Sequence, residues 1–227
     1  MNDDFLFIRL MSRHDYEMLK RNYNKHILCR ELGDIRLVVV RKPDLIVPES
    51  LYKVSVRDVE LELPRDKREL RELYDRAEWN TRVSMPPRIY FSEKIAGKDL
   101  YHTGVFMEEE YGYGYSPAVI DKKRSMSGMR LTNSSWFGGG VAAFYPGTAK
   151  RIADMLESDF YMTLPSIHEA RIHSCRWTNV QEVHRAISHW NDVHYMKKGE
   201  NIFSSCVFRF CKSRGEYQTV EYYDWNK

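Results

Sequence analysis

The chain has 227 residues, of which 43% are hydrophobic and 30% charged, and its 35 basic and 32 acidic residues give a formal net charge of +3. This composition is typical of a globular protein with a buried core, and it excludes the strong basic excess of a dedicated nucleic-acid-binding surface. No apolar run approaches the roughly 20 residues that span a bilayer, and the start of the chain is acidic where a secretory signal is basic, so we expect a cytoplasmic protein without membrane contact.

The N-terminal third predicts two helices and two strands. Ser12 is a suitable N-cap for a helix over 12–29. A β-branched run over 35–40 predicts a buried strand, and alternation over 54–63 predicts a half-buried one. Apolar residues spaced three and four apart over 65–79 predict an amphipathic helix, so this part combines both kinds of element.

The middle of the chain is the least regular part. Pro86-Pro87 ends the preceding helix, and short strands are predicted at 89–91 and 100–107. Residues 107–129 combine charge blocks with glycine and predict a long loop or hairpin tip. The prolines therefore divide a possible N-terminal substructure, 1–85, from 86–227.

The C-terminal part predicts strands and helices in irregular order. A strand at 129–132, a turn at Gly138-Gly139-Gly140, a strand at 141–145 and a helix opening at Pro146 come first. Strands at 160–164 and 170–172, a helix capped by Asn179 and closing strands at 207–210 and 219–223 follow. We therefore expect an α+β fold, with a mixed or antiparallel sheet and several packed amphipathic helices in a single compact domain, 1–227.

Several separate stretches resemble one uncharacterised bacterial family, domain of unknown function number 5688, found mainly in gut Firmicutes and often near mobile elements. The stretches are Phe5 to Leu10, Glu72 to Ala77 with Asn80-Thr81-Arg82 and Pro86-Pro87, Leu131-Thr132-Asn133, Gly140 to Ala143 with Tyr145-Pro146-Gly147, and Pro165 to Glu169. None of them is a catalytic signature, so the resemblance implies relatedness and a small cytoplasmic protein, and no activity. The chain departs from the family pattern at Tyr111 to Tyr115, which resembles an insertion, at Trp136-Phe137 and at Thr163-Leu164.

Ser166, His168 and Glu169 are the candidate catalytic residues, because a nucleophile, a base and a carboxylate occur together at the end of a strand. On an extended strand, Ser166 and His168 share a face while Glu169 points away, so this carboxylate does not orient the imidazole as a triad requires. The favoured interpretation is a polar corner in which Ser166 and Glu169 satisfy backbone donors and His168 is a hydrogen-bonded structural residue.

Metal, phosphate and cofactor sites are not predicted. Cys206 and Cys211 are an odd number of residues apart on a strand and therefore lie on opposite faces, which argues against a metal or disulfide role. The triglycine segment lacks the Lys-Ser/Thr of a phosphate-binding loop and precedes an apolar strand. His184, His189 and His194 recur every five residues and cannot converge on one metal ion from one helix.

Two kinds of macromolecular partner are considered. Basic and aromatic groups suited to nucleic acid occur at Lys122-Lys123-Arg124, Arg171, Arg176 and Trp177, but balanced charge favours solvated basic residues and a core tryptophan. Tyrosines on a glycine-rich segment provide amphipathic contact area, so the candidate binding residues are Tyr111, Tyr113, Tyr115 and Trp136. A loop packed on itself is the alternative for this segment.

The sequence therefore favours a non-enzymatic accessory protein that binds a partner, such as a host protein. The alternative is a hydrolase or phosphate-handling enzyme built around the Ser166-His168-Glu169 corner.

Overall fold

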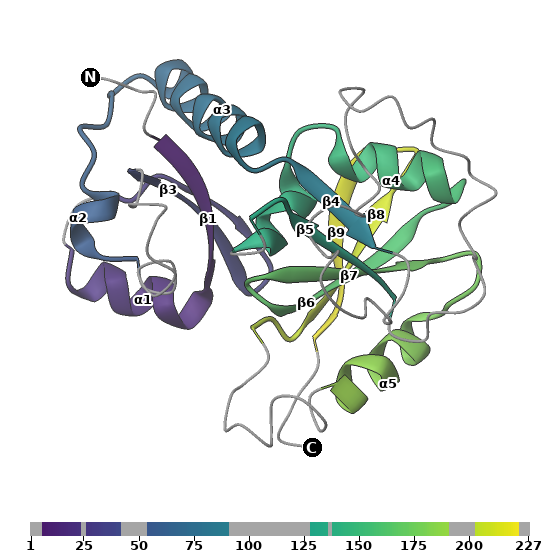
Figure 1. The fold of residues 1–227 in the computed structure, drawn as a ribbon. Coiled ribbons are helices and arrows are strands. Elements are labelled where there is room, and N and C mark those ends of the chain that lie inside the picture. The colour runs from purple at the N-terminus through teal and green to yellow at the C-terminus, as the bar shows by residue number, and fades with distance from the viewer. Residues whose placement is uncertain are drawn as a thin grey trace. The chain divides into compact units, whose positions relative to one another are not determined.

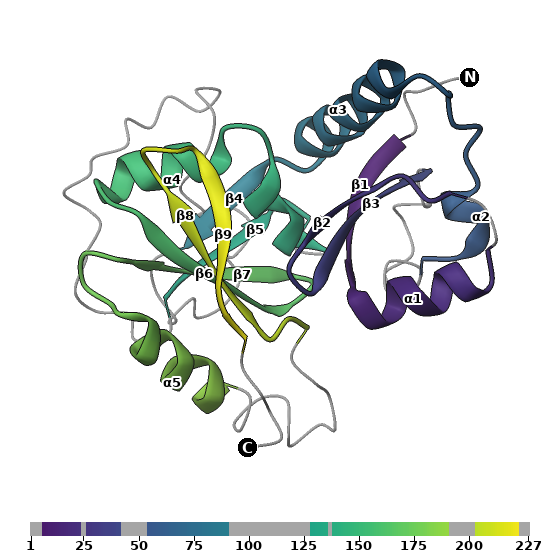
Figure 2. The same ribbon diagram turned by 180° about the vertical axis from the view of Figure 1, so that it is seen from behind.

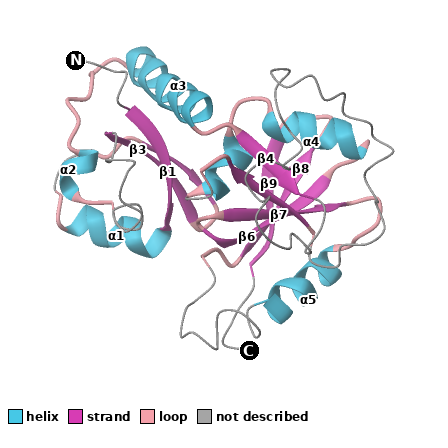
Figure 3. Cartoon of the chain, viewed as in Figure 1, coloured by secondary structure: helices cyan, strands magenta, loops and turns pink. Residues whose placement is uncertain are grey.

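The computed structural model describes residues 6–23, 26–41, 54–90, 128–135, 138–190 and 203–222. The chain forms two compact units, Met1–Pro86 and Pro87–Lys227. Their boundary falls at the paired prolines that the sequence singles out. Helices and antiparallel sheets occur together, which confirms the α+β class (Figures 1 and 3). The grouping of both units into one domain stays a prediction.

Unit 1 contains a three-stranded antiparallel sheet in the order β1-β3-β2, formed by β1 (Leu6–Ser12), β2 (Cys29–Leu32) and β3 (Ile35–Arg41). Helices α1 (Arg13–Arg21) and α2 (Val56–Val59) pack on one face of it. Their core includes Phe7, Val38 and Val40 from the sheet, with Leu19 and Val59 from the helices. Helix α3 (Lys67–Ser84) lies along β1 (Figure 1).

The first predicted helix begins where expected and ends early. The Ser12 hydroxyl accepts the Asp15 backbone N–H at 3.0 Å, which confirms the cap, but α1 stops at Arg21. Cys29 belongs instead to β2, which pairs with β3 across the turn at Gly33, where φ is +55°. Cross-strand pairing thus overrides the local helical pattern in the second half of the predicted helix.

The strand predicted over 54–63 is wrong, because Val56–Val59 is a helical turn. The Asp58 carboxylate accepts the Ser55 N–H at 2.7 Å and the Ser55 hydroxyl at 2.8 Å. This side-chain cap begins a helix at the point where Arg57-Asp58 breaks the alternating pattern.

Side chains of α3 satisfy backbone groups of β1, which is an outer strand of its sheet. The hydroxyl of Thr81, which is fully buried, accepts the Ile8 N–H at 2.7 Å and donates to the Ala77 carbonyl at 2.6 Å. The Asn80 amide donates to the Leu6 carbonyl at 3.2 Å. Helix α3 therefore covers a strand edge that would otherwise expose unpaired groups.

Unit 2 contains a six-stranded antiparallel sheet in the order β4-β5-β7-β6-β8-β9 (Figure 2). Its strands are β4 (Pro87–Tyr90), β5 (Met129–Asn133), β6 (Phe160–Ser166), β7 (Glu169–Ser174), β8 (Cys206–Cys211) and β9 (Glu216–Tyr222). The predicted strands at 129–132, 160–164, 170–172 and 207–210 fall on these elements, as do those at 89–91 and 219–223 up to residues 90 and 222, where the described residues end. The 100–107 strand and almost all of the 107–129 loop lie outside the described residues.

Helices cover both faces of this sheet. The 3-10 helix η5 (Gly139–Phe144) packs against β5, β7 and β4, and α4 (Thr148–Leu156) packs against η5. Helix α5 (Val180–Trp190) packs through Val183 and Ile187 against Val207, which by strand alternation is on the face opposite to buried Phe208. The predicted cap at Asn179 forms: its Oδ1 accepts the Glu182 N–H at 3.0 Å, and the Glu182 carboxylate accepts the Asn179 N–H at 2.9 Å.

The strand predicted over 141–145 is wrong, because residues 141–144 belong to η5 and Tyr145 is its C-cap. Gly138 adopts a left-handed conformation with φ of +61°, and the six-residue 3-10 helix begins at the next residue. The residues from Gly139 to Ala143 are buried, and their small side chains let the tight helix lie close to β5. Helix α4 then begins at Thr148, two residues after Pro146.

Replacing Thr81 with valine tests the covering of β1. The variant keeps the side-chain volume but leaves the Ile8 N–H and the Ala77 carbonyl without the hydroxyl, so we expect unfolding to require about 1–3 kcal/mol less free energy. Urea unfolding measures this, with Val83→Thr at an exposed position of the same helix as control. Equal stability of the two variants would contradict a role for the hydroxyl.

Candidate functional site

The candidate site lies where the tip of the β6–β7 hairpin meets the end of β5 and the beginning of η5. Ser166 pairs with Glu169, and Ile167 and His168 form the turn between them. The sequence prediction assumed an extended strand through His168. The chain instead turns at Ile167 and His168. The Gly140 N–H donates to the Ile167 carbonyl at 2.9 Å, so the glycine segment holds the tip of the hairpin.

Hydrogen bonds engage both the side chain and the backbone of His168. Its imidazole Nδ1 accepts the Gly138 N–H at 3.2 Å, and its carbonyl accepts the Thr132 hydroxyl at 2.8 Å. Its own N–H donates to the Ser166 hydroxyl oxygen at 3.1 Å. The corner thus joins three segments that are far apart in sequence, and Ser166 satisfies a backbone donor as the sequence predicts.

Glu169 is bound by two guanidinium groups, which differs from the expectation that it satisfies backbone donors. Its Oε2 lies 2.6 Å from Arg130 Nε, and its Oε1 lies 2.8 Å from both Nε and Nη2 of Arg171. Arg130 and Arg171 stand directly opposite each other on β5 and β7. The carboxylate therefore relieves the repulsion between two like charges on neighbouring strands.

This geometry differs from that of a serine–histidine–carboxylate triad. In a triad the imidazole Nδ1 carries a hydrogen that it donates to the carboxylate, and Nε2 accepts the proton of the nucleophile. Here Nδ1 of His168 accepts a backbone N–H, which leaves the hydrogen of the neutral ring on Nε2. The Glu169 carboxylate is directed to the arginines of the sheet.

Gly139 allows the close approach on which the corner depends. A Cβ at this position would overlap the Thr132 hydroxyl and lie 2.6 Å from the His168 carbonyl oxygen and 2.8 Å from the Asn133 nitrogen. Asn133 itself is fully buried, and its Oδ1 accepts both the N–H and the hydroxyl of Ser135, at 3.1 and 2.8 Å. Only glycine leaves room for these contacts.

His173 follows Glu169 and Arg171 on the same face of β7, at alternate positions. The side chain is 3% exposed, and burial, with a smaller effect of the Arg171 charge, lowers its pKa to about 4. Gly128 packs directly over the ring, since a Cβ there would lie 2.7 Å from Nε2. The imidazole is therefore neutral at physiological pH.

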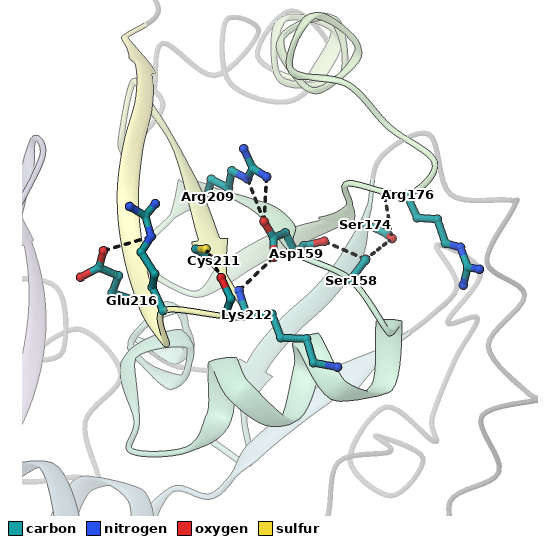
Figure 4. A network of polar contacts seen from close by, with 10 residues as sticks. Ser158, Asp159, Ser174, Arg176, Arg209, Cys211, Lys212 and Glu216 are labelled. Atoms are coloured by element: carbon teal, nitrogen blue, oxygen red, sulfur yellow. Dashed lines mark hydrogen bonds and ion pairs between the residues drawn. The ribbon is translucent and has the colours of Figure 1, made fainter.

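A second polar network lies at the opposite end of β6 and centres on Asp159 (Figure 4). One carboxylate oxygen, Oδ2, accepts from Arg209 Nε and Nη2 at 3.2 and 2.7 Å, and the other accepts the Lys212 N–H at 2.9 Å. These bonds, led by the one from the Lys212 N–H, lower the Asp159 pKa. The network fixes the β8–β9 turn to the start of β6.

All four cysteines are free thiols. Cys206 is buried whereas Cys211 is partly exposed, in agreement with their placement on opposite faces of β8. Hydrogen bonds from Ser213 and Arg214 lower the pKa of Cys211 to about 7, and burial raises that of Cys175 to about 11.

The sequence-predicted binding residues are only partly described. Tyr111, Tyr113, Tyr115, Trp136 and the basic run 122–124 lie outside the described residues, as does His194. Trp177, expected in the core, is 48% exposed, and the Arg176 guanidinium lies 5.5 Å from its ring centroid. Arg171, considered for nucleic-acid contact, is instead buried against Glu169.

The partners Arg130 and Thr132 were not found as site residues from the sequence. Alternation on one strand pairs Glu169 with Arg171, so that contact could have been predicted. Arg130 and Thr132 reach the corner only through the β5–β7 pairing, which links residues about 40 positions apart and leaves no local signal.

A titratable carboxyl is also buried in unit 1. Glu78 on α3 is 7% exposed, and burial raises its pKa to about 7, although Arg30 Nη1 lies 3.5 Å from its Oε1 and opposes the shift. Arg30 is half exposed and stacks over the Tyr74 ring at 4.5 Å. Because the ion pair is long and its arginine is exposed to solvent, its attraction does not offset the free-energy cost of desolvating the carboxylate.

Replacing Gly139 with alanine tests the close approach at the corner. We expect a loss of about 3 kcal/mol or more in the free energy of unfolding, because the new methyl group overlaps backbone atoms that cannot move independently. Gly138→Ala is the control, since a Cβ there meets open space and adds only left-handed strain of about 1–2 kcal/mol. A smaller loss at Gly139 than at Gly138 would contradict the packing argument.

Replacing Glu78 with glutamine tests its burial. The folded carboxyl binds its proton more tightly than the unfolded one, so stability falls as pH rises from about 4.5 to about 7. We expect Glu78→Gln to match the wild type near pH 4 and to exceed it by about 3 kcal/mol at pH 8. Urea unfolding at several pH values measures this, with Glu69→Gln at an exposed position of the same helix as control, and an unchanged pH slope in Glu78→Gln would contradict it.

Metal ligands do not converge within the described ranges, where no group of three or more His, Cys, Asp or Glu side chains could hold an ion. Among the helices of these ranges, none has the length and apolar character needed to cross a membrane. Comparison with known proteins gives no matching family model, no similar curated protein and no similar solved structure.

Proposed function

We propose that the chain is a non-enzymatic accessory protein of a bacterium, phage or mobile element, which acts in the cytoplasm by binding another protein. The observation that carries the proposal is the use of the polar groups at the hairpin corner. His168 Nδ1 accepts a backbone N–H and the Glu169 carboxylate binds two arginines, so both groups serve the fold. This favours a binding role over the hydrolase alternative.

The charges favour a protein over a nucleic acid as partner. Arg171 is buried in its ion pair with Glu169, and Arg176 pairs with Glu157 at 3.3 Å. Arginines held in this way contribute less to phosphate binding, which depends on accessible cations. The tyrosines at 111, 113 and 115 provide contact area of the kind found in protein-binding loops.

A comparison of loop variants tests the proposal. The tagged full-length chain is purified gently from its native lysate, and co-purifying proteins are quantified by mass spectrometry. We expect a stoichiometric partner that is lost when Tyr111, Tyr113 and Tyr115 are all replaced by serine, because the aromatic contact area is removed. A variant with serine at 122–124 is the matched control and should keep the partner.

Two outcomes would contradict the proposal. Loss of the partner in the 122–124 variant, together with bound nucleic acid in the wild type, would identify a nucleic-acid-binding protein. A hydrolytic turnover that disappears in His168→Ala without a change in unfolding free energy would restore the enzyme alternative.

A further inference from the structure

The outer strands of the two sheets differ in length and in whether other elements cover their free edges. Within the part of the chain that the structure describes, four strands are outermost in their sheets: β1, β2, β4 and β9. Side chains of α3 bind the backbone of β1. Strands β2 and β4 have four residues each, and β4 begins with Pro87, which has no N–H to offer. Strand β9 has seven residues and, among the described elements, pairs only with β8.

The Tyr217 side chain anchors strand β9 to the core of unit 2. The Tyr217 hydroxyl donates to the Ala143 carbonyl at 3.0 Å. Its ring centroid lies 5.2 Å from that of Phe210, 5.5 Å from that of Phe144 and 6.1 Å from that of Phe160. The aromatic packing fixes the position of the strand, so its outer edge is ordered before any partner arrives and little entropy is lost on pairing.

The segment Tyr217 to Thr219 is complementary to itself in the antiparallel direction. With a two-fold axis through Gln218, Tyr217 faces Thr219 of the other copy, and Glu216 lies opposite the bulge that Val220 forms. No carboxylate then opposes another, and the pairing of an aromatic with a β-branched residue is favourable. The pairing would also cover Val220, which is 43% exposed. Val220 is the extra residue of a bulge opposite Val207–Phe208, so the regular segment of β9 runs from Glu216 to Thr219.

We propose that β9 is a homodimerisation edge, at which a second copy of this chain adds its own β9 in antiparallel register about Gln218. The two six-stranded sheets then form one continuous sheet across the two-fold axis, joined by main-chain hydrogen bonds. The proposal stands independently of the binding function proposed above, because it uses residues of β9 alone.

Opposite charges at the two-fold axis test this register. In Gln218→Lys and in Gln218→Glu, two like charges face each other across the axis, so we expect each variant alone to weaken the dimer about tenfold or more. An equimolar mixture places lysine opposite glutamate and should restore it. Sedimentation velocity over a wide concentration range measures the dimer, and Gln218→Asn, which stays neutral, is the matched control.

Three results would overturn the proposal. These are a wild-type chain that stays monomeric at every concentration, charged variants that dimerise as the wild type does, and a mixture that stays monomeric. Circular dichroism melting establishes that each variant is folded. Because Gln218 is a partly exposed residue of an outer strand, we expect its replacement to leave the melting temperature within a few degrees of the wild type.

Discussion

The close approach of the Gly139 backbone to Thr132 and His168 is the constraint on which the architecture of unit 2 depends. It places the start of η5 within hydrogen-bond distance of the hairpin tip, where the N–H groups of Gly138 and Gly140 find their acceptors. The same approach brings the end of β5 to the hairpin through the Thr132 hydroxyl. Because Gly139 has no side chain, three segments from different parts of the chain can pack together at one corner.

The hydrogen-bond partners of the corner residues follow from their removal from water. Polar groups that leave water lose hydration and must find partners in the protein. Nδ1 of His168 and the carboxylate of Glu169 do so with a backbone N–H and with two guanidinium groups. A group engaged in this way is poorly placed to move protons, because any transfer first breaks a bond that holds the fold. The residue types of a hydrolase can thus occur together for structural reasons.

The sequence predicted local features well and non-local ones poorly. The caps at Ser12 and Asn179 depend on residues three positions away, and both form as expected. The helix at 56–59 and the 3-10 helix at 139–144 were missed, because apolar alternation competed with a capping box and with glycine conformations. The contacts of the corner residues with Arg130 and Thr132 depend on strand register, which short-range patterns do not encode.

The covering of β1 by α3 has a consequence for synthesis on the ribosome. The three strands of unit 1 are complete at Arg41, but the Ile8 N–H receives its acceptor from Thr81, which is 73 residues later in the chain. At translation speeds of about 5–20 residues per second, the nascent sheet waits on the order of seconds with one edge unpaired. During this interval the emerging chain exposes a template for strand addition.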